Sequence, residues 1–175
     1  MSWIVVDIET DGPVPGLYSM VQVGAIVVRE PLAEAPTFFG QMRPVSSCYN
    51  SRYLNAAGLT REQTLRFDGP ASVMRQFYEW VNRHGGGKPR FASDNCGFDH
   101  MFVEWYSWSY LDSTIFGHQL THIGSLFRGL ARDAAADFKH LRDTPHTHNP
   151  VDDARGNAEA LLKMRDRFGL DITFE

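Results

Sequence analysis

Residues 3–9 read Trp-Ile-Val-Val-Asp-Ile-Glu and give the first indication of the fold. Its bulky, β-branched beginning and polar end predict a buried strand that stops at the edge of a sheet. Because strand side chains alternate between faces, Asp7 and Glu9 should point to one side and Ile8 to the other. Carboxylates about 7 Å apart along a strand repel one another, and such a pair suits a cluster of divalent ions. Acids before a turn also occur as simple turn formers, so this pair alone leaves both interpretations open.

Working outward, the chain indicates one mixed sheet covered by helices. Apolar, β-branched runs predict further strands at 20–28, 37–43 and 91–93. Apolar residues at helical spacing predict helices at 71–83, 97–110, 123–132 and 151–168. Short connections among the first three strands favour an antiparallel meander, and the later alternation of helix and strand completes an α/β pattern. We interpret Gly85–Gly87 as a surface turn, so residues 1–175 are expected to form a single domain.

Charge and composition narrow the possible functions. The 175 residues include 17 Lys and Arg against 21 Asp and Glu, a formal net charge of −4. Proteins that coat nucleic acid are usually basic, because phosphate neutralisation supplies most of that affinity. The acidic balance disfavours such a role but suits an enzyme that holds a few nucleotides at one chain end. Two cysteines give no disulfide framework, and neither a signal peptide nor an apolar span of about 20 residues is evident. We therefore expect a cytoplasmic protein with no membrane association.

Two further segments carry acids. Asp94-Asn-Cys-Gly-Phe-Asp99 follows a predicted strand and opens a helix, which places Asp99 near the sheet edge. An acid at that position usually stabilises the helix dipole, by less than about 1 kcal/mol. His148-Asn-Pro-Val-Asp-Asp153 places a histidine on a loop, because Pro150 suits the first turn of a helix. The side chains of Asp152 and Asp153 lie about 100° apart around that helix, so geometry leaves open which of them faces a site.

Together the three segments resemble, in order and spacing, the motifs of the DEDDh 3′→5′ exonucleases. Asp7 to Thr10 matches Asp-x-Glu-Thr, Asn95 to Asp99 matches Asn-x-x-Phe-Asp, and His148 to Ala154 matches His-x4-Asp-Ala. The resemblance covers nearly the whole chain and selects Asp153 over Asp152. It implies a ribonuclease H-like α/β fold, with a five-stranded mixed sheet in the order 3-2-1-4-5 flanked by helices. Two positions differ from the frequent family residues, Asp94 for His and Gln22 for Glu; neither is a metal ligand in the family, and both bear on substrate preference.

The resemblance also implies a mechanism. A metal-dependent 3′→5′ exonuclease of this kind removes 5′-mononucleotides from single-stranded RNA or DNA, or from short oligonucleotides. Two Mg²⁺ ions per site, replaceable by Mn²⁺, would be held by carboxylates, their preferred ligands: Asp7, Glu9, Asp99 and Asp153. His148 would act as general base, since histidine ordinarily titrates near working pH. The terminal nucleotide would be bound by Ile8, Thr10, Asn95 and Phe98.

Several alternatives remain. A polymerase-associated proofreading subunit is one, although no clamp-binding segment is apparent and a stand-alone enzyme is favoured. A non-catalytic nucleic-acid-binding module is another, disfavoured because all five motif residues are present. A zinc hydrolase would use His118 and His122, or His146 and His148, but the helical His-Glu-x-x-His pattern is absent. Small RNA-trimming members of the family are frequently homodimers, so a homodimer is also an expectation.

Two groups of side chains allow more than one interpretation. The aromatic residues of the predicted helix 97–110 suit a protein core, a subunit interface or a base-stacking surface: Phe98, Phe102, Trp105, Tyr106, Trp108 and Tyr110. A basic group before the third motif suits either phosphate contacts or a solvated face: Arg128, Arg132, Lys139, His140 and Arg142.

Overall fold

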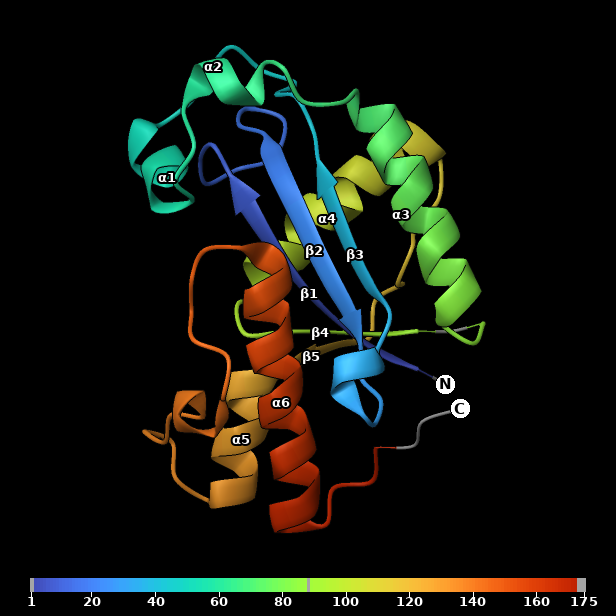
Figure 1. Ribbon diagram of the computed structural model, residues 1–175, viewed down its shortest axis with the longest axis vertical. Helices are drawn as coiled ribbons and strands as arrows, with labels where there is room; N and C mark the ends of the chain where they lie inside the picture. The colour runs from blue at the N-terminus through green and yellow to red at the C-terminus, as the bar shows by residue number, and fades with distance from the viewer. Residues whose placement is uncertain (1, 88, 173–175) are drawn as a thin grey trace.

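The computed structural model describes residues 2–87 and 89–172, and it places five strands in one mixed sheet (Figure 1). Their order is β3-β2-β1-β4-β5, as predicted. Strands β1 to β3 are antiparallel neighbours, whereas β4 runs parallel to β1 and β5 parallel to β4. The strands are β1 (Trp3–Thr10), β2 (Met20–Val27), β3 (Thr37–Gln41), β4 (Arg90–Ser93) and β5 (Leu120–His122). The sequence pattern located the first four, but it did not reveal the short, polar β5.

Four long helices match the predicted ranges to within one residue at each end: α3 (Pro70–His84), α4 (Cys96–Leu111), α5 (Ile123–Ala131) and α6 (Pro150–Phe168). Four short helices were not predicted, because each is too short to show a periodic pattern: α1 (Ser51–Ala56), α2 (Arg61–Thr64), and the 3₁₀ turns η1 (Leu32–Glu34) and η2 (Lys139–Leu141). Within the described ranges, no helix combines the length and apolar character needed to cross a membrane.

The alternation of β1 divides the core into two layers. Ile4, Val6 and Ile8 pack with residues of α3 and α4. Trp3 and Val5 pack on the opposite face with residues of α5 and α6. In Figure 1, α6 lies in front of the sheet and α4 behind it. Asp7 and Glu9 share the parity of Trp3 and Val5, so their side chains leave β1 on the α6 side.

The start of α6 is positioned by a glycine in the neighbouring strand. Gly24 of β2 lies opposite Asp7 in the β1–β2 ladder. A Cβ atom on Gly24 would overlap the backbone of Pro150, the first residue of α6. The missing side chain therefore lets the first turn of α6 rest directly on β2, one strand away from Asp7. This close contact brings the third sequence motif to the first.

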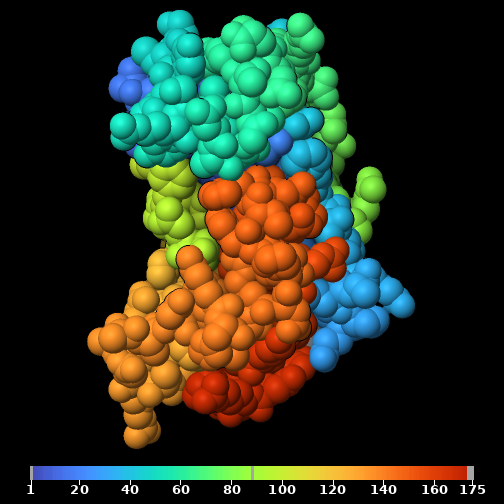
Figure 2. All heavy atoms as spheres, turned by 60° about the vertical axis from the view of Figure 1, so that its left-hand side comes forward, coloured from blue at the N-terminus to red at the C-terminus, as the bar shows by residue number. Residues whose placement is uncertain are grey.

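The segment that carries α1 and α2 is attached to the end of β1 by a buried ion pair. The side chain of Asp11 is fully buried, and an Nη atom of Arg61 lies 2.6 Å from its carboxylate. The other Nη atom of Arg61 donates to the carbonyl of Ser46, and the amide of Asn50 donates to the carbonyl of Asp11. The segment forms the teal region at the top of Figures 1 and 2. These contacts hold the segment beside the polar end of β1.

Candidate active site

The two acids of β1 lie at the end of the strand, in surroundings that disfavour their charge. Burial, followed by the neighbouring carboxylates Asp99 and Glu9, raises the pKa of Asp7 well above its ordinary value. Burial, followed by the charge of Asp153, raises the pKa of Glu9 to about 8. Both carboxyl groups would be stabilised as anions by a nearby cation, because opposite charge lowers the pKa of an acid.

Asp99 reaches the same region from the first turn of α4. Its side chain is buried, and the hydroxyl of Ser93, the last residue of β4, donates to its carboxylate. The backbone carbonyl of Asn95 accepts from the amides of Phe98 and Asp99, which begins the helix. Burial raises the pKa of Asp99 despite the Ser93 hydrogen bond. The strand–turn–helix connection thus directs a buried acid toward β1, as the sequence predicted.

Asp153 is the most completely hydrogen-bonded acid of the site. One carboxylate oxygen lies 3.0 Å from Arg142 Nη2, 2.9 Å from His146 Nδ1 and 3.1 Å from the amide nitrogen of Thr147. The other oxygen accepts from the amide of His148 at 3.0 Å. These contacts attach the loop before α6 to a buried residue of its first turn. The neighbouring Asp152 instead accepts from the hydroxyl of Thr147, so Asp153, the residue that the resemblance indicates, is the one of the two whose carboxylate is buried beneath this loop.

The acids gather into two groups that share Asp7. Carboxylate oxygens of Asp7, Glu9 and Asp153 lie within 4.8 Å of one another, and so do those of Asp7, Asp94 and Asp99. The sequence placed Asp94 outside the metal ligands, whereas the structure brings its carboxylate to Asp7 and Asp99. Its position directly after β4 was the one signal that could have indicated this. Two groups of hard oxygen ligands joined at one carboxylate form a candidate site for two divalent cations.

His148 lies at the exposed rim of this cluster. Its ring is 44% exposed, and Nδ1 lies 3.6 Å from a carboxylate oxygen of Glu9. The backbone of His148 is left-handed, with a φ of 59°. Its ring packs edge-on against the ring of His146, and the two ring centroids are 4.3 Å apart. The predicted loop position is therefore correct. The amide contact with Asp153 therefore holds a solvent-exposed imidazole beside the carboxylate of Glu9.

Comparison with known proteins places this geometry in a family. No family model matches the chain. A 3′-5′ DNA exonuclease of Escherichia coli, Cap18, is 32% identical over 179 residues, an alignment that covers 94% of this chain and 91% of the relative. The chain belongs to the DEDD-type 3′→5′ exonuclease family. The family resemblance predicted from the three motifs is thereby confirmed.

Solved exonuclease structures share the fold. A full-length 3′-exonuclease superimposes with a TM-score of 0.75 at 15% identity, over 98% of this chain and 84% of the other. The zinc-bound complex of Escherichia coli exonuclease I with single-stranded DNA gives a TM-score of 0.73 at 13% identity. That match covers 95% of this chain but only 40% of exonuclease I. At these identities the likeness establishes the five-stranded exonuclease fold, and the chain spans less than half of the larger enzyme.

The four residues predicted to bind the terminal nucleotide differ in accessibility. Ile8 is buried in the core beneath the sheet, and Thr10 is also buried. With both side chains buried, Ile8 and Thr10 would contact a nucleotide through their backbone atoms. Asn95 is exposed. The ring of Phe98 is half-buried and lies against that of Phe102, with the two ring centroids 5.1 Å apart. Asn95 and Phe98 are therefore the two that present side chains beside Asp99.

The sequence suggested that Arg142, with its basic neighbours, would either contact phosphate or lie on a solvated face. The structure instead buries this side chain. The side chain is only 5% exposed, and its guanidinium pairs with Asp153. Room for it is made by Gly156, where a Cβ atom would overlap the guanidinium. Gly156 lies three residues after Asp153, on the same face of α6. The sequence offered no signal for this pair, because the loop that carries Arg142 has no periodic pattern.

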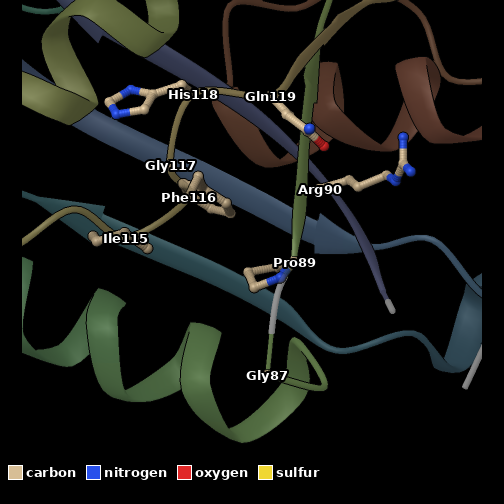
Figure 3. Close-up of a pocket in the computed structure, with 8 residues that line it drawn as sticks. All are labelled: Gly87, Pro89, Arg90, Ile115, Phe116, Gly117, His118 and Gln119. Atoms are coloured by element: carbon tan, nitrogen blue, oxygen red, sulfur yellow. The ribbon is translucent and has the colours of Figure 1, made fainter.

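A separate hollow of about 390 Å³ lies at the beginning of β4. Figure 3 shows it between the turn that carries Phe116 and Gly117 and the start of the strand at Pro89 and Arg90. The acidic cluster lies beyond the other end of β4, where Asp94 follows Ser93. Among the residues that the structure describes, no carboxylate lines this hollow, so these residues do not supply the ligands that the chemistry of the family requires.

Proposed function

We propose that this chain is a divalent-metal-dependent 3′→5′ exonuclease that removes 5′-mononucleotides from single-stranded DNA, with residues 1–175 acting as one exonuclease domain. The observation that carries the proposal is the pair of carboxylate groups joined at Asp7. Family membership supports the reaction class. DNA is favoured over RNA because the Escherichia coli relative is a DNA exonuclease, and exonuclease I has been solved with dT13 and dA16 oligonucleotides.

The residues of the site fit divalent cations. Asp7, Glu9 and Asp153 would hold one ion, and Asp7, Asp94 and Asp99 the other. The raised pKa values of Asp7, Glu9 and Asp99 support this assignment, since the protein by itself stabilises their anionic forms poorly. When bound, two such ions activate a water molecule and stabilise the charge on the leaving 3′ oxygen.

Charge compensation supports a role for Arg142 in this arrangement. Asp7, Glu9, Asp94, Asp99 and Asp153 carry five negative charges when ionised, and a scissile phosphodiester adds a sixth. Two Mg²⁺ ions supply four positive charges, and the buried guanidinium of Arg142 supplies a fifth beside Asp153. Arg142 thus keeps one carboxylate oriented before any ion binds. It acts through Asp153 and is a positioning residue.

His148 is proposed as the general base. Its ring lies on the solvent side of Glu9, and its backbone amide is attached to Asp153. A ring nitrogen takes the proton of the attacking water, while the backbone contact keeps the imidazole near the cluster. Removing a positioned general base lowers a rate by about 10²–10⁴. We expect His148→Ala to show a loss of this size with binding preserved.

The test is cleavage of 5′-labelled DNA and RNA oligonucleotides, single- and double-stranded, with Mg²⁺, Mn²⁺ or EDTA. A metal-dependent ladder that shortens from the 3′ end, strongest on single-stranded DNA, is expected. Asp7→Asn and Asp153→Asn should abolish it without unfolding the protein, whereas Asp152→Asn, outside both carboxylate groups, should retain it. Full activity of Asp7→Asn would refute the assignment. Binding without cleavage would favour the non-catalytic module, and a preference for RNA would correct the substrate.

A further inference from the structure

The outer face of α4 is apolar, although it is turned away from the core. Phe102 and Tyr106 occupy the inner face and are fully buried. A row of apolar side chains runs beside them at helical spacing, here called the α4 stripe: Phe98, Met101, Trp105 and Trp108. Phe98 and Trp105 are partly buried against the core, whereas Met101 and Trp108 lie on the outer side of the helix. Surface helices normally place polar residues on this side. Met101 is 38% exposed and Trp108 is 55% exposed, and contiguous exposed apolar side chains mark binding surfaces.

The most exposed ring of the stripe, that of Trp108, is held in place. The indole NH of Trp108 donates to a carboxylate oxygen of Glu104 at 2.8 Å. The second oxygen of Glu104 accepts from the hydroxyl of Thr114 at 2.9 Å. An exposed tryptophan fixed in this way loses little conformational entropy when a planar ligand stacks on it. A shallow hollow beside the stripe is lined by His100, Met101, Glu104, Trp105, Trp108 and Ser109.

The apolar surface continues into the β1–β2 loop. The indole ring of Trp105 lies against Gly16, and a Cβ atom on this glycine would be 3.4 Å from the ring. Val14 and Leu17, on either side of Gly16, are 47% and 54% exposed. This loop follows β1 directly, so the surface adjoins the strand that carries Asp7 and Glu9. The α4 stripe is therefore not an isolated patch on the molecule.

The stripe begins at the proposed active site. Phe98, its first member, is the residue before Asp99, and Trp108 lies ten residues further along the same helix. At about 1.5 Å per residue the stripe extends roughly 15 Å, the length of about four nucleotides stacked 3.4 Å apart. In Figure 2 the yellow-green surface of α4 borders the hollow between the teal segment with α1 and α2 and the orange loop before α6. A strand whose 3′ end lies at Asp99 could thus follow the helix outward.

We infer that the α4 stripe is a stacking track for the bases that precede the 3′-terminal nucleotide of a single strand. The inference rests on the proposed function, and it identifies the surface that would hold the nucleotides upstream of the 3′ end. Planar rings stack on any base, so they suit an enzyme that must degrade strands of any sequence. The net charge of −4 leaves little general attraction for phosphates, which makes stacking the main source of affinity along this face.

A second copy of the chain is the competing occupant, and the area of the patch disfavours it. A completely exposed aromatic side chain presents about 150–250 Å², so Trp108 at 55% exposure offers about half of that. Met101, Val14 and Leu17 add smaller areas, and the sum stays well below the roughly 800 Å² per partner of a stable interface. A single strand needs only one ring per base.

The experiment measures binding of single-stranded DNA of two, four and eight nucleotides in EDTA, where the proposed cleavage cannot occur. Trp108→Ala should weaken binding of the eight-nucleotide strand by about 5- to 150-fold, the equivalent of one base–aromatic stack. Binding of the dinucleotide, which ends near Phe98, should be unchanged. Trp108→Phe should restore most of the affinity. With Mg²⁺, the KM of Trp108→Ala for long strands should rise while kcat is retained.

Tyr78→Ala supplies the matched control, because Tyr78 is an exposed aromatic side chain on α3, the helix beside β3 (Figure 1), and lies outside the α4 stripe. It should leave binding of all three lengths unchanged. If Trp108→Ala binds the eight-nucleotide strand as tightly as the unaltered protein does, the stacking track is refuted. It is also refuted if sedimentation shows that the unaltered protein is a dimer and that Trp108→Ala is a monomer, because the stripe would then be a subunit interface. Binding with the expected length dependence but no cleavage under any metal would refute the proposed function and leave the track standing.

Discussion

Replacing Glu9 by glutamine should stabilise the metal-free protein at neutral pH. Burial, and then the charge of Asp153, raises the pKa of Glu9 to about 8 from its ordinary value of 4.5. The folded protein therefore retains a proton that the unfolded chain releases. The resulting stability is fully present below pH 4.5 and is lost as the pH rises through about 8, because the folded state binds more protons across that window. Glutamine keeps the shape of the side chain and removes this dependence.

The size of the effect follows from the same values. Each pH unit between the two pKa values contributes about 1.4 kcal/mol. Between pH 4.5 and pH 7 the ionisation of Glu9 therefore lowers the free energy of unfolding by about 3 kcal/mol. The side chain of Glu9 is 13% exposed, and a protonated His148 would lie 3.6 Å away. Solvent and this imidazole both reduce the loss, so we expect Glu9→Gln to be about 1–3 kcal/mol more stable at pH 7.

Urea unfolding in EDTA at pH 4.5 and pH 7 measures this difference. The two proteins should be nearly equally stable at the lower pH and should diverge at the higher one. Added Mg²⁺ should reverse the order at pH 7, because the carboxylate gains a cation that the amide binds poorly. Glu62→Gln, at an exposed position of α2, should change stability by no more than about 0.5 kcal/mol at either pH. Parallel pH profiles for Glu9→Gln and the unaltered protein would refute the reasoning.

Three substitutions test the packing that supports the site. Gly156→Ala should displace the guanidinium of Arg142 and lower the cleavage rate at least about tenfold, with more Mg²⁺ needed for half-maximal activity; an unchanged metal titration would contradict the positioning role. Gly24→Ala should push the first turn of α6 away from β2 and destabilise the fold by about 1–3 kcal/mol, measured by thermal unfolding together with activity. Tyr106→Phe should cost about 1–3 kcal/mol in denaturant unfolding, because the tyrosine oxygen accepts from the buried amide of Met20 at 3.0 Å. A loss below about 0.5 kcal/mol would show that this amide finds another partner.

The aromatic helix shows how much a sequence pattern can leave undecided. The spacing of Phe98, Phe102, Trp105 and Trp108 predicted a helix, and α4 is that helix. Since aromatic residues lie on both of its faces, periodicity could not distinguish a core side from a binding side. The structure assigns Phe102 to the core and leaves Trp108 exposed. The difference depends on which face meets the sheet and α3, a property of the packing and not of the helix itself.

The basic residues and the second acid group illustrate the same limit. Arg142 and Asp153 are 11 residues apart, with an irregular loop between them. Nothing local indicates that the guanidinium turns inward toward Gly156. Asp94 likewise joins Asp7 only because β4 pairs parallel with β1. Both contacts depend on the paths of connecting loops, which sequence patterns describe least well.

Local sequence patterns were sufficient to predict the four long helices, the first four strands and the acidic residues that these elements carry. Alternation along residues 3–9 placed Asp7 and Glu9 on one face, and Pro150 with its neighbours began a helix one turn before Asp153, because strand and helix periods are local properties of the backbone. Tertiary structure decided which segments meet. The absent side chain of Gly24 lets α6 rest against β2 beside Asp7, and that contact brings carboxylates more than 140 positions apart in the chain into one cluster. Long-range contacts of this kind arise from packing shape, which no periodicity in a single segment records.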